Sequence, residues 1–301
     1  MVTFFVSVHE KETDAALRLT IESVRRFGKV VVHFDRPELL RSWVKELVDD
    51  VVFINGLGLG RSWAYENIDD DYVCTVDSHI YMFRFKPEGF CDYKRYDYGF
   101  DVEDKPWVIK DIGTKHFGQL NWNRRFGSWV FECTEKWYSY NPLVCLPRHI
   151  VKKLRDVYSK YGFRVIPWRG WGSDQEQVSV SAVRLFGGAR CVNELTYAHR
   201  ATVSNTEHPF WKDRWSGDYL NEWYQANSCF LKLHYPRELW KFAPFNPEWC
   251  RYVDDETVKR MQDEFRYSYW DFLKNSWSLL DEKDKKIAED ELKYVSRNSL
   301  V

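Results

Sequence analysis

The sequence predicts an α/β protein built on a mostly parallel sheet that helices cover on both faces. The first observation is that short apolar runs alternate with segments of helical periodicity over residues 1–80, as in strands joined by helical crossovers. The second is that these runs are almost continuously apolar, which is typical of strands buried on both faces. The third is that acidic residues follow several of the runs, at the sheet edge where open α/β sheets bind ligands.

Each early element follows from its own pattern. Apolar runs predict strands at 4–8, 30–34, 51–54 and 72–76. Apolar residues at helical spacing predict helices at 14–27, 39–47 and 61–68. Gly28 is expected to stop the first helix, and the three glycines of residues 56–60 indicate a flexible loop before the third.

The pattern loosens over residues 81–140, where turns and aromatic residues are expected in place of regular elements. The next elements expected are a strand at 142–146, a helix at 149–161 that Gly162 stops, and a helix from about 173 to Gly187. After Tyr219 the chain is rich in Trp, Tyr and Pro, and it becomes helical from Asp255 onward. We therefore expect an aromatic-rich, helical C-terminal extension.

Composition excludes some classes of protein. Lys and Arg number 44 and Asp and Glu number 45, so the basic excess of a nucleic-acid-binding protein is missing. No apolar run reaches the length of a membrane span, and the run at 4–8 is too short for a signal peptide. The seven scattered cysteines form no C-x-x-C pair, which argues against a zinc knuckle and favours a reducing compartment. Cys74 and Cys145 are expected to be small buried hydrophobes. A cytoplasmic protein is the expectation, with contact to a membrane surface left open.

The triplet Asp77-Ser78-His79 is the most informative motif. It follows the apolar run at 72–76, so its acid and imidazole lie just past the carboxyl end of a strand. Carboxylate oxygen and imidazole nitrogen both bind divalent ions such as Mn²⁺, and a diphosphate leaving group needs such an ion to neutralise its charge. Such a triplet also occurs by chance in turns at strand ends, so alone it is a weak signal.

Three other charged residues are candidates for binding a nucleotide. Glu10 and Asp35 follow the first two strands; they are either simple loop carboxylates or acceptors for a base and a ribose. Arg61 follows the glycine-rich segment and is either a solvated residue at a helix start or a clamp for a diphosphate. Among the 15 Trp, Trp211, Trp215 and Trp223 form either a helical core stripe or a platform for an acceptor sugar.

The ordered motifs together resemble GT-A glycosyltransferases. Gly-Leu-Gly-Arg at 58–61 is similar to the Gly-Leu-x-Arg stretch that precedes the metal motif in the polypeptide N-acetylgalactosaminyltransferases, and Asp-Ser-His at 77–79 resembles their Asp-x-His motif. Trp-Gly-Ser-Asp-Gln-Glu at 171–176, with Gly-Gly at 187–188, resembles their Trp-Gly-x-Glu-x-x-Glu … Gly-Gly segment. Ala-His-Arg at 198–200 resembles their Gly-His-x-x-x-Arg piece. The resemblance covers residues 3–200, and the set is more specific than any one motif.

The sequence also departs from that family. His9 stands before Glu10 where the family usually has Asn, and Phe186 replaces the Cys before the two glycines. Arg200 follows His199 directly, and no lectin-type repeat is found. Membership of the broader family-two glycosyltransferases is therefore as well supported as membership of the polypeptide-modifying branch.

The resemblance implies roles for particular residues. Asp77, His79 and His199 would hold one divalent ion, Mn²⁺ or alternatively Mg²⁺, with Asp77 also at the nucleotide. Asp174 would be the main catalytic carboxylate, with Glu176 second; the carboxylate either takes the acceptor proton or orients the substrates. The reaction implied is transfer of a sugar from a nucleotide-diphosphate sugar, expected to be a UDP-sugar, to a hydroxyl of a glycan, protein or lipid-linked acceptor.

The domain organisation implied is a GT-A domain over 1–205 and an extension over 206–301. Within the GT-A domain, 1–80 would bind the nucleotide and 81–205 would hold the acceptor and the catalytic groups. The alternative function is a catalytically inactive protein that binds carbohydrate or nucleotide sugar on the same fold. A nucleotidyltransferase is disfavoured because the segment after the first strand is not a basic, glycine-rich loop.

Overall fold

The computed structural model describes most of the N-terminal half and separate pieces beyond it. The described residues are 1–10, 12–86, 93–100, 106–114, 120–123, 128–131, 143–167, 177–178, 181–182, 184–185, 195–200, 233, 254–265, 282, 285–286, 289–290 and 293. The strands at 93–100, 106–114, 120–123, 128–131 and 195–200 are described by their backbone.

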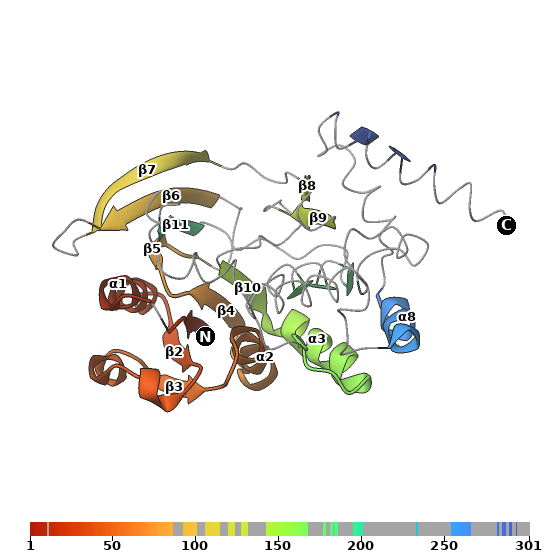
Figure 1. Ribbon diagram of the computed structural model, residues 1–301, viewed down its shortest axis with the longest axis horizontal. Coiled ribbons are helices and arrows are strands. Elements are labelled where there is room, and N and C mark those ends of the chain that lie inside the picture. Colours follow the sequence, from red (N-terminus) through yellow and green to blue (C-terminus); the bar gives the residue numbers. More distant parts are fainter. Residues whose placement is uncertain are drawn as a thin grey trace.

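A five-stranded sheet forms the centre of the N-terminal half (Figure 1). Its strands are β1 (Val2–Val8), β2 (Lys29–Phe34), β3 (Asp50–Phe53), β4 (Tyr72–Asp77) and β10 (Leu143–Pro147), in the order β10-β4-β1-β2-β3. The first four are parallel, and β10 runs antiparallel beside β4. The mostly parallel sheet expected from the apolar runs is confirmed.

A second sheet occupies much of the region where only turns were expected. Its order is β5-β11-β6-β7, and a separate pair joins β8 to β9. The strands are β5 (Ile80–Arg84), β6 (Tyr93–Phe100), β7 (Pro106–Thr114), β8 (Leu120–Asn123), β9 (Ser128–Phe131) and β11 (Leu195–Arg200). The expectation of turns was wrong because these strands lack the long aliphatic runs of the central sheet: β6 and β11 mix aromatic with charged residues, and β8 and β9 are only four residues long. Strand formation here follows from pairing between segments, which sequence propensity does not report.

Helices cover both faces of the central sheet. Phe4 points toward the face of α1 (Asp14–Val24), where its ring contacts Phe85, while Phe5 points to the opposite face and contacts Trp63 of α2 (Leu57–Asn67). This alternation follows from the two-residue period of a strand. Helix α3 (Arg148–Lys160) follows β10 and packs beside α2 (Figure 1). The apolar positions expected to face inward in α3 are buried, and Gly162 ends it with a φ of 75°, as expected.

Two expected helices differ in the structure. The first ends at Val24 and continues as turns, and Gly28 is needed for another reason: a Cβ there would lie 2.4 Å from the Val2 carbonyl oxygen. The expected helix at 39–47 is two single turns of 3₁₀ helix, Pro37–Leu39 and Ser42–Glu46. The chain is extended at Arg41 between them, where the Arg41 guanidinium pairs with Asp14 at 2.5 Å and draws the segment toward α1.

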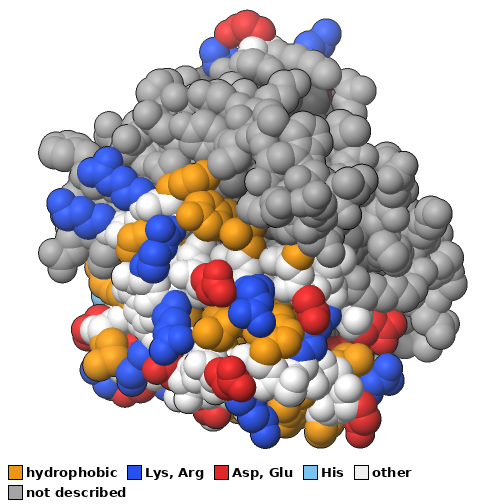
Figure 2. Space-filling view, turned by 90° about the vertical axis from the view of Figure 1, so that its left-hand side faces the viewer, with side chains coloured by type: hydrophobic (Ala, Val, Ile, Leu, Met, Phe, Trp, Pro, Cys, Tyr) orange, Lys and Arg blue, Asp and Glu red, His pale blue; other side chains and the backbone are white. Residues whose placement is uncertain are grey.

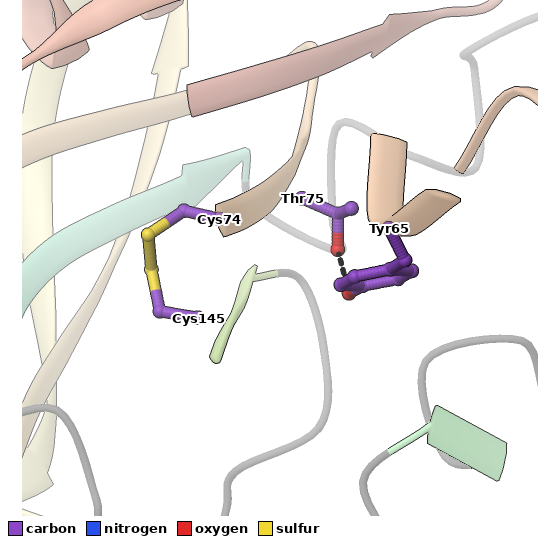
Figure 3. The surroundings of a disulfide bond; sticks show 4 residues. All are labelled: Tyr65, Cys74, Thr75 and Cys145. Carbon is purple, nitrogen blue, oxygen red and sulfur yellow. Dashed lines mark hydrogen bonds between the residues drawn. A yellow bond between two sulfur atoms is a disulfide. The ribbon is translucent and has the colours of Figure 1, made fainter. Parts of the chain in front are cut away.

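The cysteines of β4 and β10 form a disulfide. Cys74 and Cys145 are opposite each other in the antiparallel register and are joined by an S–S bond, while Tyr65 of α2 meets the neighbouring Thr75 with 2.8 Å between their hydroxyl oxygens (Figure 3). The cysteines are buried as expected, but the sequence analysis did not predict that they pair. A pair separated by 71 residues is recognisable only once the register of two strands is known.

The described part of the C-terminal region docks on α3. Helix α8 (Asp255–Asp263) confirms the helix expected from Asp255, and the Tyr161 hydroxyl donates to the Arg260 carbonyl at 3.1 Å. Buried Arg184 donates to the Leu233 carbonyl at 3.1 Å and lies over the Phe265 ring. Within the described residues, no helix is both long and apolar enough to cross a membrane.

Candidate functional site

The carboxyl ends of β1, β2 and β4 bring most of the expected site residues to one edge of the central sheet. Asp77 is the last residue of β4 and is paired in register with Ser7 of β1. Val8 of β1 is in turn paired with Phe34, the residue before Asp35. Because parallel strands end at the same edge, Glu10, Asp35 and Asp77 all follow that edge.

Arg61 lies beneath this edge and not in solvent. Its side chain is 2% exposed and forms an ion pair with Asp77, whose side chain is 18% exposed. A buried guanidinium requires a paired anion, because removing a charge from water is costly. The interpretation of Arg61 as a solvated helix-start residue is therefore wrong, and Arg61 fixes the Asp77 carboxylate from below.

The expected flexible loop at 56–60 is instead the first turn of α2. Gly56 has a φ of 116°, and α2 begins at Leu57. A Cβ on Gly60 would lie 2.2 Å from Cε1 of His33, so the helix reaches the sheet only because Gly60 has no side chain. Gly60 therefore serves close packing of α2 against the sheet. The next residue, Arg61, is thereby placed against Asp77.

His33 is a buried imidazole below that turn. Its ring lies stacked beside Phe5, with centroids 5.6 Å apart, and its Nε2 lies 2.7 Å from the Ile54 carbonyl oxygen, to which it donates. Burial lowers the pKa of His33, with the nearby Arg61 charge acting in the same direction and the Ile54 hydrogen bond and Asp35 opposing it. The ring is therefore held in its neutral form.

Glu10 and Asp35 lie at the edge in partly exposed positions. Asp35 accepts a hydrogen bond from the Gly56 backbone amide at 3.3 Å and so ties the end of β2 to the turn before α2. Glu10 pairs with Arg36 at 3.2 Å. Both carboxylates are accessible to solvent at this edge of the sheet. Their contact with a base and a ribose stays a prediction.

Glu12 is a site residue that the sequence reasoning missed. Its carboxylate is buried and lies 2.8 Å from both the Ser78 hydroxyl and Nδ1 of His79. The available signal was its place as the second acid of Glu10-Lys11-Glu12, immediately before Thr13, the N-cap of α1. Only the first acid of that segment was considered.

The sheet register brings His199 close to the triplet in space. Strand β11 pairs antiparallel with β5, and His199 is the partner of Ile80, the residue after His79. Within the described residues, no three His, Cys, Asp or Glu side chains form a ligand group, and the structure gives His199 by its backbone. Asp77 and His79 provide the carboxylate and imidazole donors that suit Mn²⁺ or Mg²⁺-type sites.

The expected catalytic carboxylates, Asp174 and Glu176, lie outside the described residues, as do Trp211, Trp215 and Trp223. The residue after Glu176 is described: Gln177 is helical and fully buried, and its amide donates to the Tyr158 hydroxyl at 3.0 Å and to the Val165 carbonyl at 2.9 Å. Burial raises the pKa of Tyr158 to about 12. The helix expected in this segment is confirmed at the described positions, and Gln177 fixes it against α3.

The surface of the described part carries both signs of charge. Figure 2 shows Lys and Arg side chains interspersed with Asp and Glu, with apolar side chains between them, on one face of the molecule. Among the described residues, Arg148 and Arg155 both contact Asp69.

Comparisons with known proteins identify a relative and a fold. No family model matches the chain. The chain is similar to the "Uncharacterized 38.7 kDa protein" of Thermoproteus tenax virus 1 (strain KRA1), at 40% identity over 274 residues, covering 82% of this chain and 80% of the relative. It also superposes on the crystal structure of GalNAc-T7 with UDP, GalNAc and Mn²⁺, with a TM-score of 0.61 at 15% identity.

The structural match covers 91% of this chain and 56% of the GalNAc-T7 chain, so this chain spans little more than half the length of that protein. At this identity the match shows a shared fold. The level of identity to the viral protein, over four fifths of both chains, shows common family membership. The chain therefore belongs to the family of the 38.7 kDa protein of Thermoproteus tenax virus 1, and its fold is the GT-A fold of glycosyltransferases.

Proposed function

We propose that this chain is a metal-dependent glycosyltransferase that moves a sugar from a nucleotide-diphosphate sugar, a UDP-sugar, to an acceptor hydroxyl. The observation that carries the proposal is the arrangement at the carboxyl edge of β4: Asp77 is held by buried Arg61, His79 is held by buried Glu12, and His199 is in register beside them. The structural match supports the choice of ligands, since GalNAc-T7 was crystallised with UDP, GalNAc and Mn²⁺.

Asp77, His79 and His199 would hold the divalent ion, Mn²⁺ or alternatively Mg²⁺. The donor set fits, because Asp77 contributes a carboxylate and His79 an imidazole whose Nδ1 is engaged by Glu12. When bound, the ion would neutralise the negative charge on the departing diphosphate. Glu10 and Asp35 would accept hydrogen bonds from the base and ribose, and Arg61 would place positive charge beneath the diphosphate.

Asp174 would be the catalytic carboxylate, with Glu176 second. In an inverting reaction the acceptor oxygen forms a bond to the anomeric carbon while the bond from that carbon to the diphosphate oxygen breaks. The hydroxyl proton then passes to the Asp174 carboxylate. In a retaining reaction the same carboxylate would orient donor or acceptor. Gln177, the residue after Glu176, is anchored on Tyr158.

The proposal also covers the domain division, the acceptor and the location of the protein. We propose a division into a GT-A domain over 1–205 and an extension over 206–301, with Trp211, Trp215 and Trp223 on the acceptor side. The acceptor would be a glycan, a protein or a lipid-linked sugar, and the last of these would require contact with a membrane surface. A cytoplasmic location belongs to the same proposal.

A thermal-shift screen of nucleotide sugars with and without Mn²⁺ tests the proposal. We expect UDP to raise the Tm of the parent protein and Mn²⁺ to increase that shift, because ligands that bind the native state stabilise it. Asp77→Asn should lose the Mn²⁺-dependent part. Asp69→Asn is the matched control, since it also removes an acid paired with an arginine but lies at the opposite end of β4.

The same proteins separate an enzyme from a binding protein. With Mn²⁺ and the preferred UDP-sugar, the parent should release UDP slowly by hydrolysis, and Asp174→Asn should abolish turnover while keeping the Mn²⁺–UDP shift. Binding without any turnover by the parent would favour the inactive carbohydrate-binding alternative. The absence of any shift with nucleotides and Mn²⁺ would contradict both.

A further inference from the structure

Glu12 is a buried carboxylate that connects two segments of the site. Its side chain is 1% exposed, although an acid in this position costs several kcal/mol to bury unless it is paired and hydrogen-bonded. Oε2 accepts from the Ser78 hydroxyl and lies 2.8 Å from His79 Nδ1, and Oε1 accepts from the Thr13 amide at 3.1 Å. The carboxylate therefore joins the segment after β1 to the turn after β4.

The position of Glu12 is fixed by its own segment. The Glu12 amide donates to the His9 carbonyl at 2.9 Å, and the Glu12 carbonyl accepts from the Arg41 guanidinium. Thr13 caps α1 immediately afterwards, so the carboxylate stands at the N-terminal end of a helix, where the dipole stabilises a negative charge. Glu12 is thus a rigid support and not a mobile loop residue.

The contact determines how the His79 ring is presented. When Nδ1 donates its proton to a carboxylate, the neutral ring carries its lone pair on Nε2, and the ring is also held in one orientation. His79 is 22% exposed while Glu12 is buried behind it. Glu12 is therefore placed to act on a ligand through His79, which is the arrangement of carboxylate, histidine and metal seen in many metal sites.

We infer that Glu12 is a positioning residue for the metal site: its carboxylate orients His79 so that Nε2 is the ligand atom. This inference rests on the proposed function, because it requires that Asp77 and His79 bind a divalent ion. Ser78 has a supporting part, since its hydroxyl occupies the same Glu12 oxygen and limits rotation of the carboxylate.

The test is a titration of the full chain with Mn²⁺ in the presence of UDP, followed by calorimetry and by the Mn²⁺ EPR signal. Glu12→Gln preserves the shape but removes the charge, and the loss of such a supporting group typically costs 10- to 100-fold in metal affinity. We expect Mn²⁺ affinity to fall by about that factor, while UDP affinity without metal stays unchanged. Glu66→Gln is the matched control: Glu66 also accepts a serine hydroxyl at 2.8 Å, from Ser62, but its other contacts are the Val165 amide and, at 3.9 Å, the Arg164 guanidinium.

The same Glu12→Gln change made in a His79→Ala protein shows whether Glu12 affects Mn²⁺ affinity through His79. In His79→Ala, the further change Glu12→Gln should leave Mn²⁺ affinity unchanged, because the group that Glu12 orients is gone. A purely structural role would instead lower affinity in both backgrounds. If Glu12→Gln does not fold, Glu12→Asp carries the test, since it keeps the charge but withdraws the carboxylate by one methylene group; the same loss of Mn²⁺ affinity is expected.

The outcomes separate the inference from the proposed function. Parent-like Mn²⁺ affinity in a folded Glu12→Gln or Glu12→Asp protein overturns the inference and leaves the proposed function standing. An equal loss in the parent and His79→Ala backgrounds also overturns it. A parent protein that binds no divalent ion with or without UDP contradicts the proposed metal site and the inference together.

Discussion

Charged and titratable residues beneath the candidate site each have a specific neighbour. Arg61 is held by Asp77, Glu12 by Ser78 and His79, and His33 by Ile54 and the face of Phe5. His33 differs from the other two because burial keeps it neutral. It is therefore the residue through which acid should weaken this part of the structure.

Because of His33, the free energy of unfolding is expected to decrease as the pH is lowered. The pKa of His33 in the folded chain is lowered. Below the ordinary imidazole pKa of about 6.5, His33 therefore binds a proton in the unfolded chain but stays neutral in the folded chain. The free energy of unfolding should then decrease by up to about 1.4 kcal/mol for each pH unit in the window between 6.5 and the folded pKa. Above pH 6.5 this contribution does not change.

Urea unfolding of the parent and of His33→Gln between pH 4.5 and 7.5 measures this effect. The two proteins differ at His33 alone, so the difference between their slopes reports on His33 and the charges that interact with it. Parallel pH profiles for the two proteins would show that His33 is not responsible.

Glu12 also shows the limit of sequence reasoning at this scale. Its partners Ser78 and His79 are 66 and 67 residues away, and no local pattern reveals such a contact. Asp35 and Asp77, by contrast, were predictable because a residue that follows a buried parallel strand has a known place at the sheet edge.

At the scale of elements, helix α2 depends on a contact between its backbone and the sheet. Gly60 lies against the His33 ring, and that ring is held in place by Phe5 and Ile54. The helix carries Arg61, so the approach of α2 to β2 also sets the position of the guanidinium at Asp77.

Gly60→Ala should destabilise the protein although alanine is the better helix former. Alanine gains about 1 kcal/mol in helix propensity, but its Cβ would lie 2.2 Å from the His33 ring, and overpacking of this kind costs about 1–3 kcal/mol or more. We expect a net loss in the free energy of unfolding by chemical denaturation. In a His33→Ala background the ring is absent, so Gly60→Ala should be neutral or stabilising there; a loss of the same size in both backgrounds would contradict the explanation.

The elements themselves were predictable to different degrees. Strands β1, β2 and β4 are continuous apolar runs, and α3 has an unbroken apolar stripe, so local pattern was sufficient. Strand β6 was missed because Lys, Arg and Asp lie between its aromatic residues, and β7 was missed because Lys110 and Asp111 interrupt its apolar residues. The segment at 39–47 was misassigned because its apolar spacing fits a helix, whereas the chain is extended at Arg41 and forms two short 3₁₀ segments.

At the scale of the whole molecule, the disulfide joins two neighbouring strands of the central sheet that are far apart in the chain. Cys74 lies in β4, which ends at Asp77 of the triplet, and Cys145 lies in β10, which comes after β5 to β9 in the chain. The bond therefore closes a loop that contains β5 to β9. It restrains the chain on either side of the candidate site.

Removal of the disulfide should destabilise the fold substantially. For a loop closed across a separation of 71 residues, the chain-entropy model gives a stabilisation of about 4 kcal/mol. We expect Cys74→Ala/Cys145→Ala to lose free energy of unfolding of this order, measured by urea unfolding without reductant. The parent with reductant should approach the double variant, and equal stability of parent and variant without reductant would show that the bond does not form.

Strand β11 has a consequence for the order in which the molecule is completed. Strands β5 and β6 are successive in the chain, yet β11 lies between them and is hydrogen-bonded to both. During synthesis on the ribosome, β5 and β6 cannot pair with each other in the native sheet and must wait until residues 195–200 have been made. Contacts between segments far apart in the chain are entropically slow to form. The strand that carries His199 is therefore made after every strand of the central sheet, so the candidate site is completed late in synthesis.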